Sequence, residues 1–380
     1  MSSRRYAVIA GGGTAGHVFV ALATARALAE RGVERDDIEL IGSARGQEAA
    51  LAGGDGFGLT LLAGRGIVRR LRPGPQLTNL VSVGGLLWAT LRALVILLRR
   101  RPRVVVSVGG YASVPAGIAA VLLRVPIVLV NVDARPGLAH RVLGRFAAAS
   151  AVAFPGTHLR HPVLTGAPVR DDLVGVHRSL DRAATARIAL GLPADRRTVA
   201  VFGGSLGARR LNDATLALAR LYAGRGGLTL YHVCGPRNFE EVEAARVELP
   251  AEGADGAGLC YRLVPFEEDM ASLYGAADVV VCRAGALSVA ELALVGMPAV
   301  LVPLPGAPGD HQSANAAALV DAGAAVMLKD EDCTGDRLAA VLNELLASPA
   351  HLAQMGEAAA ALGRPDAADA VASLVQAHAR

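Results

Sequence analysis

The chain has 380 residues, which is more than one ordinary domain holds and enough for two. Apolar residues make up 52% of it and aromatic residues only 4%, a composition that favours α/β layers over a β-sandwich. The formal net charge of +4 is too small to indicate a nucleic-acid partner by itself. Because Lys329 is the only lysine, the sequence excludes a Walker-type nucleotide-binding loop, which requires one.

Apolar runs predict an N-terminal half in which strands and helices alternate. Such continuous runs between helices are typical of a parallel sheet that is covered on both faces. The expected strands are residues 6–10, 38–41, 59–62, 104–108, 127–130 and 151–154. The expected helices are residues 14–31, 46–52, 79–101, 112–123 and 138–148.

A Pro- and Arg-containing stretch, residues 166–170, reads as a linker to a second half of the same kind. The expected strands there are residues 198–202, 228–233, 261–264, 279–282 and 299–302. We therefore predict an N-terminal domain at 1–166, a C-terminal domain at 167–350 and a helical tail at 351–380. The tail carries no strand of its own, so we expect it to pack back on the N-terminal domain.

Glycine turns follow the first strand of each half. The turn Gly203-Gly204-Ser205 leads into a helix, and a similar turn, Gly11-Gly12-Gly13, leads into another. A strand, a glycine turn and a helix N-terminus together make an anion site, because backbone N–H groups point outward there. Two such sites facing one cleft suit a protein that handles two phosphorylated molecules.

The first turn also fits the dinucleotide fingerprint G-x-G-x-x-G through Gly11, Gly13 and Gly16. A dinucleotide site additionally needs an acidic residue at the end of the second strand. Here that strand ends in Ile41-Gly42-Ser43, so the sequence disfavours an NAD cofactor. Four cysteines form no C-x-x-C pair, which favours reduced thiols in a cytosolic protein over a metal site.

Two interpretations stay open for the polar residues near the first turn. His17 is either an ordinary polar residue at a helix start or a proton acceptor, since the pKa of histidine suits proton transfer near neutrality. Gly109-Gly110-Tyr111 is either a structural turn or a ligand loop.

The second half offers further candidate ligands. Glu291 lies in the first turns of a helix that follows a glycine turn, where it either complements the helix dipole or accepts ribose hydroxyls. Asp310 is a candidate N-cap of the next helix. Gln312 and Asn315 are three residues apart, so they share a helix face and could bind a sugar.

Residues 80–98 are apolar over about the length of a membrane span. Arg92 and two glycines interrupt this run and a strand follows at once, so we predict a helix inside an α/β unit. Basic residues surround it, which favours either an anionic lipid surface or a plain solvated face. They are Arg65, Arg69, Arg70, Arg72, Arg99, Arg100, Arg101 and Arg103.

Taken together, these motifs resemble those of the MurG family of peptidoglycan glycosyltransferases, glycosyltransferase family 28, along the whole chain. The matching stretches are Gly12-Gly13-Thr14-Ala15-Gly16-His17, Gly109-Gly110-Tyr111-Ala112-Ser113, Ala167-Pro168-Val169-Arg170, Gly203-Gly204-Ser205-Leu206-Gly207-Ala208, Cys282-Arg283-Ala284-Gly285-Ala286-Leu287-Ser288 with Glu291, and Asp310-His311-Gln312 with Asn315. The resemblance implies a GT-B fold, with two Rossmann-like parallel-sheet domains facing a cleft. It also implies an inverting, metal-independent transfer of N-acetylglucosamine from its UDP ester to lipid I, giving lipid II.

The resemblance assigns roles to particular residues. His17 would be the catalytic base, with no metal and no cofactor required. The acceptor diphosphate would lie on Gly12, Gly13, Gly16, Gly109, Gly110 and Tyr111. The donor would be bound by Thr14, Ala15, Gly16, Asp133, Arg170, Gly204, Ser205, Glu267, Ala286, Leu287, Ser288, Glu291, Gln312 and Asn315.

The implied partners are UDP-N-acetylglucosamine, a lipid-linked diphosphate acceptor and an anionic membrane surface, with no nucleic acid. The expected place of action is the cytoplasmic face of the cell membrane, with peripheral attachment. Asn131 and Asp133 stand where the family usually has Glu and Asn, which removes an acid that could assist His17. Two alternatives therefore stay open: a related transferase with another lipid or natural-product acceptor, and a catalytically silent UDP-sugar-binding protein.

Overall fold

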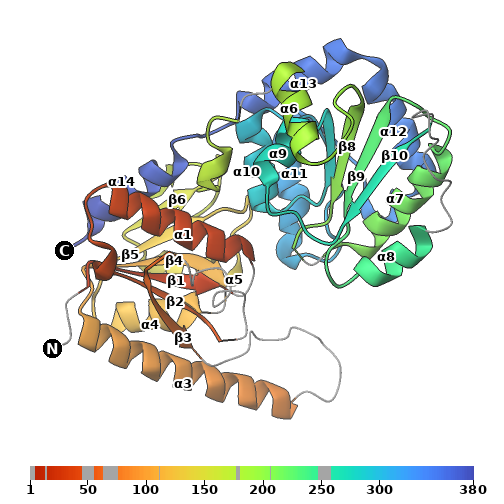
Figure 1. Ribbon diagram of the computed structural model, residues 1–380. Helices are drawn as coiled ribbons and strands as arrows, with labels where there is room; N and C mark the ends of the chain where they lie inside the picture. Colours follow the sequence, from red (N-terminus) through yellow and green to blue (C-terminus); the bar gives the residue numbers. More distant parts are fainter. Residues whose placement is uncertain are drawn as a thin grey trace. The chain divides into compact units, whose positions relative to one another are not determined.

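The computed structural model describes residues 5–12, 15–44, 55–62, 76–110, 112–176, 180–205, 207–246 and 258–380. The chain forms two compact units, each with its own sheet (Figure 1). The N-terminal unit comprises Met1–Arg170 together with Pro365–Arg380, and the C-terminal unit comprises Asp171–Arg364.

The sheet of the N-terminal unit is entirely parallel in its described strands, in the order β3-β2-β1-β4-β5-β6-β7. The chain builds outward from β1 in one direction, then returns to add β4 on the other side of β1. At such a reversal the carboxyl ends of the two strands leave a crevice in which α/β proteins bind ligands. The strands are β1 (Ala7–Gly12), β2 (Ile38–Ser43), β3 (Gly58–Leu62), β4 (Val104–Gly110), β5 (Ile127–Asn131), β6 (Ala149–Val152) and β7 (Pro162–Leu164).

Helices cover both faces of this sheet (Figure 1). Its core lies between the strands, α3 and α4, where Val8, Val105 and Leu97 are at most 1% exposed. On the other face α14 packs beside α1, and Arg31 of the α1 end pairs with Asp369 at 2.6 Å. The helices are α1 (Ala15–Glu30), α3 (Gln76–Arg100), α4 (Ser113–Leu122), α5 (Leu138–Leu143) and α14 (Ala367–His378).

The sheet of the C-terminal unit repeats this plan, with parallel described strands in the order β10-β9-β8-β11-β12-β13. Its chain reversal lies between β8 and β11. The strands are β8 (Arg197–Phe202), β9 (Leu228–Val233), β10 (Cys260–Val264), β11 (Val279–Cys282), β12 (Ala299–Leu301) and β13 (Ala325–Met327). The helices are α6 (Leu180–Ala189), α7 (Arg209–Leu221), α8 (Phe239–Arg246), α9 (Met270–Ala276), α10 (Ala286–Val295), α11 (His311–Asp321), α12 (Gly335–Ala347) and α13 (Pro349–Ala360).

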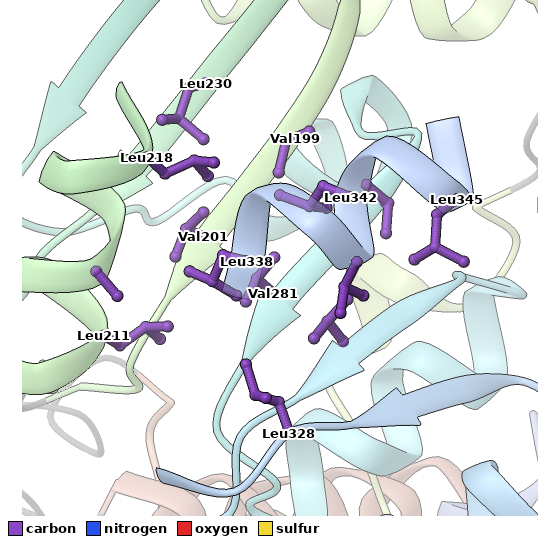
Figure 2. Packing of buried hydrophobic residues seen from close by; sticks show 14 of the residues in the cluster. Val199, Val201, Leu211, Leu218, Leu230, Val281, Leu328, Leu338, Leu342 and Leu345 are labelled. Atoms are coloured by element: carbon purple, nitrogen blue, oxygen red, sulfur yellow. The ribbon is translucent and has the colours of Figure 1, made fainter. Parts of the chain in front are cut away.

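The main core of this unit joins α7 and α12 to the central strands (Figure 2). Leu338, Leu342 and Leu345 recur at helical spacing on α12, so they share one face and meet Val199 and Val281 of the sheet. Each fully buried side chain of this kind contributes about 1.5–3 kcal/mol to stability. This packing fixes the strand ends that carry the glycine turns.

The two parallel α/β sheets that the sequence predicted are confirmed. The sequence missed β7 and β13, because three-residue edge strands carry too little apolar pattern to stand out. The helix expected at residues 46–52 lies outside the described residues. Within the described part of the chain, no helix has both the length and the hydropathy needed to cross a bilayer.

Candidate functional site

Close backbone contact joins the carboxyl ends of β1 and β4. The register of this strand pair shifts between Ala10 and Gly11, after which Gly12 lies opposite Gly110. A Cβ on Gly110 would lie 2.0 Å from the Gly12 carbonyl oxygen, and both residues have positive φ angles. Glycine is therefore required here by packing, and the binding of an anion by these backbone groups stays a prediction.

His17 lies beside this pair of strand ends. It comes from the first turns of α1, and its Nε2 lies 3.0 Å from the place that a Cβ on Gly109 would occupy. Gly109 therefore has a second role, since any larger residue would displace the imidazole ring of His17. The structure thus brings His17, Gly109 and Gly110 together within one unit. Their role in binding an acceptor stays a prediction.

A second histidine, His140 of α5, completes this cluster, and sequence reasoning missed it. Its ring is buried, with Nε2 3.1 Å from the Ser107 carbonyl oxygen and Nδ1 3.1 Å from Asn131 Oδ1. Burial, followed by electrostatic repulsion from His17, lowers the pKa of His140 to about 4. No spacing in the sequence links residues 17, 107, 131 and 140, so only the fold could reveal the cluster.

Asn131 contacts His140 through its side-chain oxygen, while its Nδ2 donates to the Asp133 carbonyl oxygen at 2.6 Å. Asn131, which stands in place of the family's usual Glu, therefore faces His140. Asp133 follows at the end of β5 and is partly exposed. Its role in donor binding stays a prediction.

In the C-terminal unit, the β8 turn consists of Gly203, Gly204, Ser205 and Gly207. Gly204 has a φ of +86°, and no atom of the described residues beyond its neighbours lies within 4 Å of the place that a Cβ on it would occupy. The α7 helix then begins at Arg209, and its N-cap residue, Ala208, has no side-chain acceptor for the first N–H groups. Together the turn and the helix start offer several backbone donors to an anion.

The start of α10 repeats this arrangement. Gly285 is the N-cap residue, in extended conformation, and has no side chain to cap the first turn, which contains Ala286, Leu287 and Ser288. Glu291 lies one turn further on and is only 9% exposed. The hydroxyl of buried Tyr274 donates to its Oε2 at 2.8 Å, which fixes the orientation of the carboxylate. Sequence reasoning missed Tyr274.

Three polar contacts hold the turn before α10 in place. Buried Arg283 donates to the Val302 carbonyl oxygen at 3.1 Å and pairs with Asp330 at 2.6 Å. Asn315, which is fully buried, donates to the Ala284 carbonyl oxygen at 3.2 Å. Asn315 therefore shapes the turn, and a direct role in sugar binding stays a prediction.

Gln312 and Asp310 lie at the start of α11. Gln312 Oε1 accepts a hydrogen bond from the Leu304 N–H at 2.8 Å, which ties the helix to the preceding loop. Asp310 is the N-cap residue of α11, as predicted, but its side chain makes no capping hydrogen bond. Asp310 adopts a left-handed conformation and its Oδ1 accepts from the Ser313 hydroxyl instead of a backbone N–H. The preceding residue, Gly309, also has a left-handed φ of 68°.

Glu267 lies just after β10 and is held by two donors. The Tyr231 hydroxyl donates to its Oε2 at 2.5 Å, and the Asp269 N–H donates to its Oε1 at 2.8 Å. Burial, followed by the hydrogen bond to Glu267, raises the pKa of Tyr231. Glu267 is thus fixed at a strand end of the same sheet edge as the β8 turn, and its role in donor binding stays a prediction.

Some predicted site residues lie outside the described residues: Gly13, Thr14, Tyr111 and the basic Arg65, Arg69, Arg70 and Arg72. Arg170 is the last residue of the N-terminal unit before the chain enters the other unit. Within the described ranges, no three His, Cys, Asp or Glu side chains are grouped so that they could hold a metal ion.

An apolar face of α3 is exposed in the N-terminal unit. Leu87, Trp88 and Leu91 are 63%, 60% and 56% exposed, and Leu98 continues the same side of the helix. Arg92 is exposed among them. A patch of this kind, with large apolar side chains beside a positive charge, marks a surface that meets another apolar phase or a partner.

Two protein-family descriptions match the chain. The glycosyltransferase family 28 N-terminal domain matches residues 7–152, and the glycosyltransferase family 28 C-terminal domain matches residues 198–371. Together they cover most of both units and include the residues of both glycine turns.

Similar proteins carry one and the same description. A protein of Acidothermus cellulolyticus is 41% identical over 372 residues, which is 98% of this chain and 97% of the relative. A Nocardioides protein is 42% identical over 370 residues, which is 97% of this chain and 96% of the relative. Both are described as UDP-N-acetylglucosamine–N-acetylmuramyl-(pentapeptide) pyrophosphoryl-undecaprenol N-acetylglucosamine transferases.

Solved structures show the same architecture. The crystal structure of Acinetobacter baumannii MurG superposes with a TM-score of 0.76 at 29% identity, covering 98% of this chain and 99% of the other. An Anabaena protein, HepE, solved in complex with UDP, superposes with a TM-score of 0.60 at 16% identity and covers 98% of both chains. At that identity the second likeness concerns the fold alone.

Proposed function

Because the chain belongs to glycosyltransferase family 28, we propose that it transfers N-acetylglucosamine from its UDP ester to undecaprenyl-diphosphate-linked N-acetylmuramyl-pentapeptide. The product would be lipid II, the disaccharide precursor of peptidoglycan. The observation that carries the proposal in this chain is a pair of helix starts in the C-terminal unit. The N-termini of α7 and α10 both follow glycine turns, and their N-cap residues, Ala208 and Gly285, have no side-chain acceptor for the first N–H groups.

The donor would be bound by these two helix starts. Backbone N–H groups at Gly204, Ser205 and the first turn of α10 would hold the diphosphate, and Arg170 would add a positive charge. Glu291, oriented by Tyr274, would accept the two ribose hydroxyls. Gln312 would bind the sugar, with Asn315 supporting the turn before α10.

The acceptor would use the N-terminal unit. Its diphosphate would lie against the glycines at the ends of β1 and β4, beside His17. The acceptor hydroxyl oxygen would attack the anomeric carbon and form the new glycosidic bond, while the bond to UDP breaks with inversion. The hydroxyl proton would pass to His17, and the electron pair of the broken bond would leave with UDP. Backbone dipoles at the donor turns would stabilise that charge without a metal ion.

The lipid part of the acceptor requires a membrane nearby. The exposed apolar face of α3 would insert at the headgroup level, and its arginines would contact anionic lipid. This would place the protein peripherally on the cytoplasmic leaflet.

The test is UDP release from UDP-N-acetylglucosamine by the full-length protein with a lipid I analogue. Release that depends on lipid I and yields the disaccharide supports the proposal. Release that occurs only with a different glycolipid or a natural-product acceptor would identify a related transferase. UDP-sugar binding without turnover on any acceptor would identify a catalytically silent homologue and overturn the proposal.

A further inference from the structure

A line of polar side chains crosses β10, β9 and α7 in the interior of the C-terminal unit. The Tyr261 hydroxyl lies 2.7 Å from His232 Nδ1, and His232 Nε2 lies 3.0 Å from Asn212 Oδ1. Asn212 Nδ2 in turn lies 2.9 Å from the Cys234 carbonyl oxygen. His232 and Asn212 are at most 1% exposed. Polar groups buried this deeply are costly unless each one is paired, and here each one is.

The donors and acceptors of this line can be arranged in only one way. The Cys234 carbonyl oxygen can only accept, so the Asn212 amide must point its Nδ2 toward it and its Oδ1 toward His232. His232 Nε2 must then carry the proton. Since burial lowers the pKa of His232 to about 3, its ring is neutral and its Nδ1 must accept from the Tyr261 hydroxyl. In each of these hydrogen bonds the donor lies on the Tyr261 side and the acceptor on the Cys234 side. We call this series the Tyr261–Cys234 hydrogen-bond series.

The Tyr261–Cys234 hydrogen-bond series ends beside the β8 turn. A Cβ on Gly207 would lie 2.2 Å from the Cys234 carbonyl oxygen and 2.3 Å from Asn238 Nδ2, so the glycine backbone sits directly against them. Asn238 Nδ2 also donates to the Cys234 oxygen at 3.1 Å. The Gly207 N–H donates to the Gly204 carbonyl oxygen at 2.9 Å. Because of this hydrogen bond, a shift of Gly207 would also move Gly204.

We propose that Tyr261, His232 and Asn212 are positioning residues that set the place of the β8 turn for the diphosphate of the donor. Asn212 also lies near the start of α7, so the same hydrogen-bond series holds the N-terminus of the helix that follows the β8 turn. The inference rests on the proposed function, because it assumes that this turn binds the diphosphate. It adds three residues that touch no ligand and act through the Cys234 carbonyl oxygen.

A purely stabilising role and a positioning role predict different binding. Loss of stability alone would leave the folded protein with unchanged affinities for all ligands. Displacement of the β8 turn would weaken ligands that carry a diphosphate and spare those that lack one. The experiment therefore compares the dissociation constants of UDP and uridine, measured by titration calorimetry and by competition, on the full-length protein.

Three variants test the Tyr261–Cys234 hydrogen-bond series. His232→Leu removes both ring nitrogens, and we expect the Kd of UDP to rise about tenfold while the Kd of uridine is unchanged. His232→Gln restores an amide N–H that can reach Asn212, and should recover most of the UDP affinity. Tyr261→Phe removes only the outer donor and should raise the Kd of UDP about threefold.

The matched control is Thr215→Val. Thr215 is a fully buried residue of α7 whose hydroxyl donates to the Leu211 carbonyl oxygen at 2.6 Å and not to a residue of the hydrogen-bond series. Its replacement should lower the melting temperature and leave the ratio of the UDP and uridine dissociation constants unchanged.

Each outcome is decisive. If the wild-type protein binds UDP no better than uridine, the proposed diphosphate site itself fails. If the wild type prefers UDP and folded His232→Leu keeps that preference, the positioning role alone is overturned. Should His232→Leu fail to fold, Tyr261→Phe decides, and an unchanged Kd of UDP in that variant overturns the inference.

Discussion

His17 and His140 flank the same point beside Gly109. His17 Nε2 lies 3.0 Å and His140 Cε1 lies 3.5 Å from the place that a Cβ on Gly109 would occupy. Two imidazolium ions this close would repel each other, and both burial and this repulsion lower the pKa of His140. Protonation of His17, the proposed base, would therefore make protonation of His140 less favourable.

Removal of the proposed base should affect turnover and spare donor binding. General-base catalysis contributes about 10²–10⁴ in rate, so His17→Ala should lower kcat by that order. Its UDP affinity should be unchanged, because the proposed donor turns belong to the other unit. Steady-state kinetics and UDP titration measure both. His351→Ala, at an exposed position of α13, is the control. Wild-type kcat in His17→Ala would place the base elsewhere.

His140 should make the protein less stable in mild acid. A histidine whose folded-state pKa is lowered binds its proton more readily when unfolded, so stability is present above pH 6.5 and is lost as the pH falls toward about 4. The shift corresponds to about 3 kcal/mol. Urea unfolding at pH 7 and pH 4 should show this loss in the wild type. Asn cannot titrate, so between pH 7 and pH 4 the free energy of unfolding of His140→Asn should fall by about 3 kcal/mol less than that of the wild type. An equal fall in both proteins would contradict the prediction.

Tyr274 should support donor binding through Glu291. Glu291→Ala removes a charge-assisted hydrogen-bond acceptor, and we expect the donor KM to rise at least about tenfold. Tyr274→Phe leaves the carboxylate present and less well oriented, so its donor KM should rise about threefold. Tyr222→Phe, which loses a hydroxyl bonded to Asn343 in the same unit, is the control and should keep the wild-type KM. An unchanged KM in Glu291→Ala would remove that residue from the site.

The α3 face should bind anionic vesicles. Sedimentation with vesicles that contain phosphatidylglycerol should carry the protein down, and high salt should release it, since each arginine near the surface contributes about 1 kcal/mol that salt screens. Leu91→Ser should weaken this binding. Leu221→Ser is a matched control, because Leu221 of the other unit is 54% exposed against 56% for Leu91. Equal binding to neutral vesicles would contradict the proposed surface.

Turnover should survive removal of divalent cations. If backbone dipoles and Arg170 stabilise the leaving diphosphate, then EDTA should leave the initial rate of UDP release unchanged. The measurement is repeated with added Mg²⁺ to detect any stimulation. Activity that EDTA abolishes and Mg²⁺ restores would refute the metal-independent mechanism.

The sequence predicted the layered fold and the family because both depend on local patterns. Buried parallel strands are continuous apolar runs, and the glycine turns at Gly11 and Gly203 are short motifs with fixed neighbours. The supporting residues were not predictable in this way. The hydrogen-bond partners of His140, Tyr274 and His232 lie 9, 17 and 20 positions away in the sequence, at no recurring spacing. A single buried His or Tyr in a sequence does not differ from an ordinary core residue.

The boundary between the two units is crossed twice, and this fixes the order in which the N-terminal unit can be completed. Its last helix, α14, comes from residues 367–378, and Val371, Ala372 and Val375 are fully buried in it. During synthesis, residues 1–170 leave the ribosome first, yet their apolar surface under α14 stays uncovered until some two hundred further residues have been made. The unit that begins first is finished last, so a nascent chain that stalls within the C-terminal unit would present an exposed apolar face to chaperones and proteases.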